Sequence, residues 1–412
     1  MNNNRAQRRD PGTPMPWRTL GAAGMCMAAV GLAGGTLVWP IDQAPSDAFA
    51  APVKTAAAPT LTRTPPTNAP SPQAVPQTRD GTGKGPASGV NDSPAGMVWI
   101  DAATFTMGST DPLARSDEQP PHRVRVDGFW IDTHEVTNRE YKEFVDATGY
   151  VTVAERAVEW EELSKQLPPG TPQPPADVLK PGSIVFTPTP GPVDLRNVGA
   201  WWRWTIGASW KQPEGPGSSI EDRMDHPVIH MAFDDAAAYA AWAGKRLPTE
   251  AEWELAARGG LDATMNVWGQ ERVDATRANI WSGDFPFRND EKDGYVRTAP
   301  VGSYPANGFG LYDVAGNAWE WCVDRFDAET YARRVSRAAD DGVITNPVGP
   351  DVGLDPNNPF ATNVRVIRGG SFLCNDSYCA SYRPSARMAA DAESGASHLG
   401  FRCVRDRDPE SR

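Results

Sequence analysis

The alternation of apolar and polar residues predicts short strands where the folded part of the chain begins. The segment MVWIDAATFTMGS starts at Met97, alternates apolar and small residues, and stops at Gly108, as a strand does. Further on, HRVRVDGFWIDTHEVT places Val124, Val126 and Phe129 on both sides of an Asp-Gly pair. Such a pair between two alternating runs is typical of a hairpin turn, so we predict two strands joined there.

Helical spacing follows in the segment NREYKEFVDATGY. Tyr141, Phe144 and Val145 recur at the interval of one helix face, and Gly149 ends the pattern. We therefore predict a helix that buries these apolar side chains.

The segment HPVIHMAFDDAAAYAAWAGKRLPTEAEWELAARGG has the clearest regular pattern. Residues 228–233 are predicted as a strand, and one of the two aspartates after them caps a helix that runs to Trp242. Thr249 and Glu252 form a capping box, in which each side chain accepts a hydrogen bond from the other residue's main-chain N–H. The helix that they begin ends at the Gly-Gly pair. Residues 260–406 are dense in Gly, Asp, Asn and Pro, which predicts ordered loops and few long helices.

A Pro-rich excursion at 165–195 interrupts this pattern. It holds nine Pro between Pro168 and Pro192, so we expect a surface segment that lines a groove. Four tryptophans follow closely, namely Trp201, Trp202, Trp204 and Trp210. Two interpretations stay open for them: a buried core, and a surface that stacks on a bound peptide.

Composition narrows the class of protein. The chain has 412 residues with 15 Trp, 38 Gly and 39 Pro, which favours a rigid, loop-rich fold over a helical bundle. Its 40 basic and 52 acidic residues give a net charge of −12, which argues against nucleic-acid binding, because phosphate binding needs a basic face. Five Cys are too few for a disulfide scaffold.

Residues 1–50 have the pattern of an export signal. Four arginines precede an uncharged apolar run at 20–39, and an Ala-Phe-Ala sequence that suits signal peptidase follows. A membrane anchor through 20–39 is the competing interpretation. Residues 51–96 hold nine Pro and no aromatic residue, which predicts a disordered linker rich in Pro, Ala and Thr. The folded domain is then expected at 97–406, with a tail at 407–412.

Cys374 and Cys379 form the main candidate site, in RGGSFLCNDSYCASYR. Their spacing allows a structural disulfide, a redox pair, or a site for a soft metal ion such as Cu(I). From spacing alone the disulfide is the default. His398 is a candidate neighbour of the pair. His226 and His230 are interpreted as structural, because the residues between them have strand character.

Two loops have the oxygen-rich composition that suits a hard cation. ANIWSGDFPFRNDEKDGY contains Asn279 and Asp293, and GLYDVAGNAWEW contains Asp313 and Glu320. On composition alone, the capping of turns is the favoured explanation for these residues.

Four segments together resemble the sulfatase-modifying-factor family: the stretch 226–260, GLYDVAGNAWEW, RGGSFLCNDSYC and LGFRC. The resemblance runs in the same order over residues 97–406. It implies a single α+β domain, C-type-lectin-like and loop-rich, with little regular secondary structure. The family includes formylglycine-generating enzymes, which oxidise one Cys of a sulfatase to Cα-formylglycine, and also binding modules without that chemistry.

The cysteine segment resembles the active site of the enzymes in this family. The resemblance implies that Cys374 and Cys379 bind Cu(I) and that O2 is the oxidant. It also implies catalytic roles for Ser371 and Trp319. The substrate would be an unfolded sulfatase polypeptide that carries a Cys-x-Pro-x-Arg motif. The alternative is a non-enzymatic binding or maturation-accessory module, in which Cys374 and Cys379 form an inert disulfide.

The resemblance further implies two structural calcium sites. The implied ligands are Asn279, Ile280, Asp293 and Tyr295 for the first site, and Asp313, Gly316, Ala318 and Glu320 for the second. Cys322 and Cys403 either pair with one another or are buried free thiols. We expect an exported monomer, periplasmic or secreted, either released or tethered to the membrane through residues 20–39.

Overall fold

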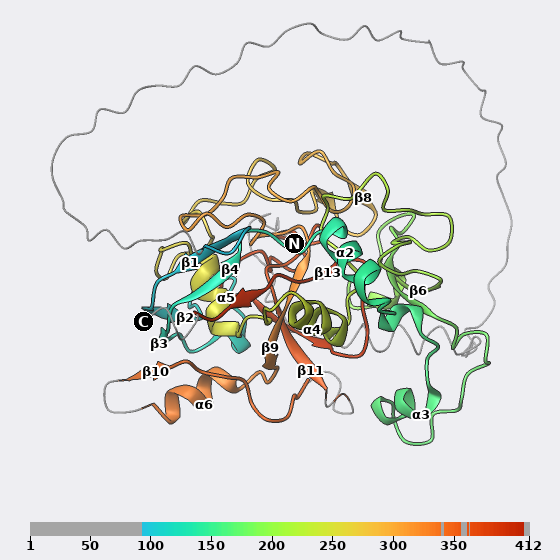
Figure 1. The fold of residues 1–412 in the computed structure, drawn as a ribbon, viewed down its shortest axis with the longest axis horizontal. Coiled ribbons are helices and arrows are strands. Elements are labelled where there is room, and N and C mark those ends of the chain that lie inside the picture. The colour runs from blue at the N-terminus through green and yellow to red at the C-terminus, as the bar shows by residue number, and fades with distance from the viewer. Residues whose placement is uncertain (1–92, 339–341, 356–360, 362, 408–412) are drawn as a thin grey trace, which may run out of the picture. The chain divides into compact units, whose positions relative to one another are not determined.

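The computed structural model describes residues 93–338, 342–355, 361 and 363–407. The predicted signal or anchor, most of the predicted linker and residues 408–412 lie outside this part. Figure 1 shows short helices and strands connected by long loops, which confirms the predicted loop-rich α+β domain. Among the described residues, no helix is both long enough and apolar enough to cross a bilayer.

Within the described residues, the strands form three larger sheets and two small pairs. The largest sheet has the order β12-β11-β9-β13 and contains β9 (Trp319–Arg325), β11 (Val364–Arg368), β12 (Arg387–Asp391) and β13 (Leu399–Gly400). The sheet β1-β4-β14 contains β1 (Met97–Ile100), β4 (Phe129–Asp132) and β14 (Val404–Arg405). The sheet β10-β3-β2 contains β2 (Ala103–Met107), β3 (His122–Val126) and β10 (Val343–Thr345). The pairs are β5 (Gly182–Phe186) with β6 (Trp202–Ile206), and β7 (Gly283–Asp284) with β8 (Arg288–Asn289).

The helices in the described part of the chain are short. The α-helices are α2 (Asn138–Thr148), α3 (Trp160–Leu163), α4 (Phe233–Trp242), α5 (Glu250–Ala257) and α6 (Thr330–Ser336). The 3-10 turns are η1 (Ser116–Glu118), η2 (Val153–Glu155), η3 (Ser164–Gln166) and η4 (Val198–Ala200). In Figure 1, α4 and α5 lie in the middle of the fold near β9 and β11, while α6 and β10 lie at one edge.

Three predicted helices are confirmed. In α2, Tyr141 and Phe144 are buried, and Gly149 closes the helix with a positive φ of 68°. In α4 the predicted aspartate cap is placed differently, because Ala232 is the N-cap residue and Asp235 lies in the first turn, where its carboxylate accepts the Ala232 N–H. The capping box of α5 also forms, because the Glu252 N–H donates to the Thr249 hydroxyl and the Thr249 N–H donates to the Glu252 carboxylate.

The predicted hairpin at Asp127-Gly128 is wrong. Two strands do flank these residues, but β3 pairs with β2 and β10, whereas β4 pairs with β1 and β14. Gly128 packs so tightly against the Trp99 ring that a Cβ there would overlap it. The chain therefore crosses from one sheet to the other at this turn. The segment from Met97 to Gly108 likewise forms two strands instead of one.

The predicted strand at 228–233 is also wrong. His230 has a φ of 65°, in the left-handed region, which a strand cannot contain. Main-chain N–H groups of this segment instead donate to separate loops: Val228 to the Val136 carbonyl, and His230 to the Ala396 carbonyl. The apolar run is buried as predicted, but its hydrogen bonds are spread over several partners.

The Pro-rich excursion is only partly a surface segment. It contains β5, every residue of which is buried, so the expectation of a purely exposed excursion is wrong. Among the four tryptophans, Trp201, Trp202 and Trp210 are buried and Trp204 is partly buried. These tryptophans are therefore part of the core. Their buried faces are not free to stack on a bound peptide.

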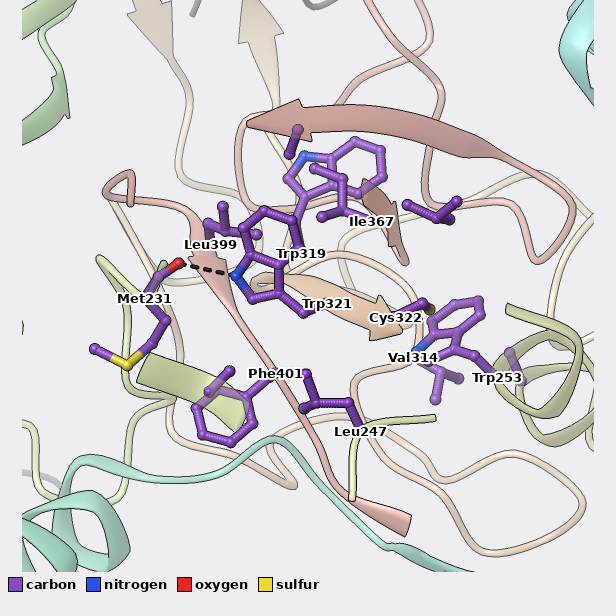
Figure 2. Close-up of a cluster of buried hydrophobic side chains, with 14 of the residues drawn as sticks. Met231, Leu247, Trp253, Val314, Trp319, Trp321, Cys322, Ile367, Leu399 and Phe401 are labelled. Atoms are coloured by element: carbon purple, nitrogen blue, oxygen red, sulfur yellow. Dashed lines mark hydrogen bonds between the residues drawn. The ribbon is translucent and has the colours of Figure 1, made fainter. Parts of the chain in front are cut away.

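The central core gathers side chains from the largest sheet and from α5. Figure 2 shows Trp319, Trp321, Ile367 and Leu399 in one buried cluster, where the Trp321 Nε1 donates to the Met231 carbonyl (2.9 Å). Cys322 lies in the same core, and both Cys322 and Cys403 are buried free thiols. Of the two alternatives for these cysteines, the unpaired state is the one observed.

Candidate active site

The two candidate cysteines lie together in the loop after β11. Cys374 and Cys379 are joined as a disulfide, with Cα atoms 5.4 Å apart. Cys374 is buried, whereas Cys379 is partly exposed. Gly369 and Gly370 lead into the loop with φ angles of 90° and 73°, which side chains other than glycine rarely adopt. After reduction, the loop would present two neighbouring thiolates, one of them reachable from outside.

A turn centred on Asn375 shapes this loop. Its side-chain oxygen accepts hydrogen bonds from the Ser377 N–H (3.1 Å) and the Tyr378 N–H (2.8 Å). Its carbonyl oxygen accepts the Cys379 N–H (3.2 Å). Asn375 therefore folds the second cysteine back toward the first, a role that the sequence did not lead us to assign. An Asn directly after the first Cys is the signal that would have indicated it.

Ser371 helps to fix the first cysteine. Its carbonyl oxygen accepts the Cys374 N–H (2.9 Å), and its hydroxyl oxygen accepts the Leu373 N–H (3.3 Å). Ser371 has no exposed surface. Because the hydroxyl acts there as an acceptor, its own hydrogen remains available to donate.

Aromatic side chains from three distant segments pack beside the cysteine loop. The Tyr378 ring stacks on Phe285 with centroids 4.3 Å apart, and the edge of Trp201 meets both rings. Trp281 packs against Phe285, and its main-chain N–H donates to the Cys374 carbonyl (3.0 Å). This aromatic wall therefore packs against the loop that carries the cysteine pair.

Trp319 is the first residue of β9 and is buried. Its main-chain N–H donates to the His398 carbonyl (2.8 Å). Two residues earlier, the Asn317 carbonyl accepts the Phe372 N–H (3.0 Å) from the cysteine loop. The start of β9 is therefore bonded to the segments that carry both Cys374 and His398.

Arg383 holds the cysteine loop in place through a buried ion pair. Its guanidinium donates two hydrogen bonds to the Glu118 carboxylate, both 2.7 Å long, and both side chains are buried. Burial alone would raise the pKa of Glu118, but the hydrogen bond and charge of Arg383 outweigh it and lower that pKa to about 2. A paired, buried Arg383 anchors the loop and does not face a substrate. Tyr382, close by, donates its hydroxyl to Asp376.

The first predicted calcium loop brings its four residues together. The Asp293 carboxylate accepts the main-chain N–H groups of Ile280 (3.0 Å) and Tyr295 (3.2 Å). The buried Oδ1 of Asn279 has no hydrogen-bond partner, while its Nδ2 donates to the Arg297 carbonyl. An unpartnered buried acceptor in a loop that also holds a carboxylate fits a cation.

The second predicted calcium loop fits less completely. Asp313 accepts the Gly302 N–H with Oδ2, and its buried Oδ1 has no partner. Burial raises the pKa of Asp313 to about 6, and the nearby charge of Glu320 adds to this effect. Glu320 is already held by Arg402 through two hydrogen bonds (2.6 and 2.8 Å) and by the Trp253 indole N–H. It can offer a cation only the lone pairs that these donors leave.

Glu135 is a buried carboxylate beside this loop that the sequence did not reveal. It has no exposed surface, and neither of its carboxylate oxygens has a hydrogen-bond partner. Burial raises its pKa well above the usual range, and the charges of Asp313 and Glu320 raise it further. No local pattern marks it, because Glu135 and Asp313 are far apart in the sequence.

The donor sets constrain which cations fit. In the part of the chain that the structure describes, no three His, Cys, Asp or Glu side chains are grouped to hold a metal ion. A cation at either calcium loop would therefore rely largely on amide and carbonyl oxygens, which suits Ca²⁺. Once its disulfide is reduced, the cysteine pair would offer two thiolates, a donor set that suits Cu(I) better than Zn²⁺.

Comparison with known proteins identifies the family. Residues 85–407 match the family described as the sulfatase-modifying factor enzyme 1-like domain. The chain is 45% identical over 315 residues to a formylglycine-generating enzyme of Thermomonospora curvata, covering 76% of this chain and 93% of that enzyme. It is 46% identical over 312 residues to one of Mycobacterium tuberculosis, covering 75% of this chain and 97% of that enzyme. The chain belongs to the sulfatase-modifying factor family.

A further relative differs in its described activity. The chain is 35% identical over 316 residues to an inactive C-alpha-formylglycine-generating enzyme 2 of Mus musculus, covering 75% of this chain and 85% of that protein. Membership of the family therefore does not by itself establish catalysis.

Proposed function

We propose that this chain is a copper-dependent formylglycine-generating oxidase that activates sulfatases. Its substrate would be the Cys of a Cys-x-Pro-x-Arg motif in an unfolded sulfatase polypeptide, and its oxidant O2. The observation that carries the proposal is the contact between Cys374 and Cys379 in a loop whose shape is held by Ser371 and Asn375. The similarity to enzymes named for this reaction supports it.

The reaction balances with one external thiol reductant. The substrate thiol-bearing methylene group becomes an aldehyde, one O2 is consumed, and two electrons and two protons enter. The sulfur leaves as hydrogen sulfide, one oxygen atom enters the aldehyde, and the second leaves as water. Two thiols of the reductant supply the electrons and protons by forming a disulfide. Cu(I) bound by Cys374 and Cys379 would supply the electron chemistry with O2 that the protein's own side chains lack.

The residues around the pair have roles that follow from their contacts. The reduced Cys374 and Cys379 hold the metal, and Asn375 keeps them adjacent. Ser371 can donate its hydroxyl hydrogen to a bound group, because its oxygen is already an acceptor. The wall of Tyr378 and Phe285 limits the entry of water, which would otherwise compete for polar groups of the substrate.

Trp319 is the remaining residue with a proposed catalytic role. It is buried at the start of β9, and its main chain is bonded to the His398 segment. We assign it to the wall of the copper site, as the family resemblance implies. The two calcium ions would be structural, because their loops brace the cysteine loop and do not contain it.

The cellular setting is also part of the proposal. Residues 1–50 would direct export to the periplasm or the medium, either by cleavage or as an anchor through 20–39, and residues 51–96 would link it to the domain. The client would arrive unfolded, since an unfolded segment can bring its Cys close to the buried Cys374 and the partly exposed Cys379. We propose a monomer that binds no nucleic acid.

A direct test is the conversion of a peptide that contains Cys-x-Pro-x-Arg. The reduced protein, loaded with Cu(I) and supplied with O2 and a thiol reductant, should convert Cys to an aldehyde, detected by mass loss and by trapping with a hydrazide. A peptide with Ser in place of Cys should stay unchanged. Absence of conversion by copper-loaded protein would overturn the proposal.

The second candidate function is a non-enzymatic binding or maturation-accessory module. The Cys374–Cys379 disulfide is the specific observation that favours it, because a disulfide cannot bind copper. Thiol titration of the folded protein separates the two functions. A pair that a mild thiol reductant opens, and that then takes up one Cu(I), supports the oxidase. A pair that stays oxidised until the protein unfolds supports the binding module.

A further inference from the structure

The cysteine loop is closed at its base by close main-chain packing. A Cβ at Gly370 would lie 2.9 Å from the carbonyl carbon of Ser381 and 2.9 Å from the main-chain nitrogen of Tyr382. The residues that enter and leave the loop are therefore packed against one another. Cys374 and Cys379 both lie within this closed stretch of chain.

The stretch after the second cysteine is tied to the buried Glu118–Arg383 ion pair. The Ser381 hydroxyl donates to the Cys379 carbonyl (3.0 Å). The Nε of Arg383 donates to the Ala380 carbonyl (3.1 Å), while its terminal nitrogens bind the Glu118 carboxylate. None of these bonds uses a sulfur atom, so all of them can persist when the disulfide opens.

The Asn375 turn does not by itself fix the loop relative to the rest of the domain. The Asn375 side chain accepts from residues 377 and 378, and its carbonyl accepts from residues 378–380, so these bonds stay inside the loop. The first cysteine is held from outside, because the Cys374 carbonyl accepts the Trp281 N–H (3.0 Å). That bond leaves the exposed middle of the loop to be held by other side chains.

Asp376 provides a bond at the exposed middle of the loop. Asp376 is exposed, and its Oδ1 accepts a hydrogen bond from the hydroxyl of Tyr382, which is 3% exposed. Burial raises the pKa of Tyr382 well above its usual range, and the hydrogen bond and charge of Asp376 add to this effect. The phenol therefore keeps the proton that it donates. The bond joins the middle of the loop to its base, where the Tyr382 main chain packs on Gly370.

We infer that Asp376 and Tyr382 are positioning residues, whose hydrogen bond keeps the thiols of Cys374 and Cys379 adjacent when no disulfide joins them. That the two thiols then bind a copper ion rests on the proposed function. Without this bond, the chain between the cysteines gains conformations when the disulfide opens, and bringing the thiols together again costs entropy. A pair of ligands that the fold already holds together avoids that cost and binds more tightly.

The first test needs neither copper nor a substrate. The protein is equilibrated with mixtures of reduced and oxidised dithiothreitol, and free thiols at Cys374 and Cys379 are trapped and counted by mass spectrometry. Each dithiothreitol that closes to its cyclic disulfide gives two electrons and two protons to the cysteine sulfurs, so the equilibrium constant reports how readily these sulfurs meet. Tyr382→Phe and Asp376→Ala should each favour the reduced state about tenfold, as the loss of one hydrogen bond predicts.

Two further variants separate the hydrogen bond from other effects of substitution. Asp376→Asn keeps an oxygen that can accept the Tyr382 hydroxyl, so its equilibrium should stay within about threefold of the wild type. The double variant with Asp376→Ala and Tyr382→Phe should shift no further than either single variant, because the same bond is missing from all three. Effects that add in the double variant would overturn the inference, since the two side chains would then act through separate contacts.

Tyr150→Phe is the matched control. The Tyr150 hydroxyl also donates to a carboxylate, Oδ1 of Asp235 in α4 (3.1 Å), but outside the cysteine loop. Its loss should leave the dithiothreitol equilibrium unchanged. An equal shift in Tyr150→Phe and Tyr382→Phe would mean a general loosening of the protein and would overturn the inference, as would an unchanged equilibrium in Tyr382→Phe.

The second test measures Cu(I) affinity by competition with a coloured Cu(I) chelator. Tyr382→Phe and Asp376→Ala keep both thiolates, yet each should bind Cu(I) about tenfold more weakly. Unchanged copper affinity beside a shifted disulfide equilibrium would overturn the assignment of these residues to the copper site. If the wild type binds no copper, the proposed oxidase fails, while the dithiothreitol equilibrium still decides whether Asp376 and Tyr382 position the thiols.

Discussion

The Asn317 N–H donates to the carbonyl oxygen of Asn279 (2.9 Å), and so joins the two loops that are expected to bind calcium. The Asn317 carbonyl accepts the Phe372 N–H, and the Gly316 N–H donates to the Gly369 carbonyl. Both calcium loops are therefore bonded to the loop that carries the cysteines. A change in either calcium loop is expected to alter the geometry of the cysteine pair, because these main-chain hydrogen bonds connect the loops.

Gly316→Ala should destabilise the protein more than Gly310→Ala does. The two glycines have nearly equal φ angles, 86° and 85°, so both substitutions carry the same backbone strain of about 1–2 kcal/mol. A Cβ at Gly316 would also overlap the Asn279 carbonyl oxygen, whereas nothing lies within 4 Å of one at Gly310. Overlap of this kind costs about 1–3 kcal/mol more. Thermal unfolding measures the difference, and equal Tm values would contradict the close contact.

Calcium should stabilise the folded protein. At about 100 times its Kd, an ion that binds only the folded state adds about 2.7 kcal/mol per site. Asp293→Ala and Asp313→Ala should each remove part of the rise in Tm between chelator and calcium. Asp284→Ala is the control, since Asp284 is an exposed residue of the first loop that pairs with Arg288 (2.7 Å). A Tm that does not change when calcium is added would contradict both proposed calcium sites.

Cys374→Ser and Cys379→Ser should each abolish copper binding and turnover together. A hydroxyl is a poor ligand for Cu(I), and one remaining thiolate cannot replace the pair. Cys322→Ala is the matched control, because Cys322 is buried in the core and unpaired. It should keep its copper and lose about 1–2 kcal/mol of stability through a small cavity. Copper analysis of the reduced, desalted proteins measures this; copper retained by Cys374→Ser would exclude that residue as a ligand.

The Glu118–Arg383 pair should make stability depend on acid pH. The pKa of Glu118 is about 2 in the folded protein and 4.5 ordinarily, so the pair contributes fully above pH 4.5. As the pH falls from 4.5 towards 2, the folded protein loses about 3 kcal/mol of stability, because each pH unit between the two pKa values contributes about 1.4 kcal/mol. Denaturant unfolding at several pH values should show a smaller slope in Glu118→Gln.

The control for this pH dependence is Glu162→Gln. Glu162 pairs with Lys165 on the surface, where an ion pair adds little. Its variant should keep the wild-type slope. Glu118→Gln should also lose about 3 kcal/mol at neutral pH, because it leaves the buried Arg383 with Asp111 (3.4 Å) as its carboxylate partner. Parallel pH curves for Glu118→Gln and the wild type would mean that the pKa of Glu118 is not lowered.

Local features could be predicted from the sequence where they depend on residues that are close together in the chain. The capping box of Thr249 and Glu252 depends on residues three positions apart, so its pattern is visible before folding. The glycines before the cysteine loop also have the positive φ that their tight turn requires. The hairpin at Asp127-Gly128 was wrongly predicted because strand pairing depends on which distant strand satisfies the backbone, and here β3 and β4 join different sheets.

The reactive groups are visible in the amino-acid sequence: two thiols in one short loop, two oxygen-rich loops, and family motifs that place them in order. Their surroundings depend on the folded structure. It paired Arg383 with Glu118, left Glu135 and His398 Nδ1 without partners, and put Trp201 beside Tyr378. These relationships join residues far apart in the chain, and burial sets their energies by removing water, so no local pattern records them.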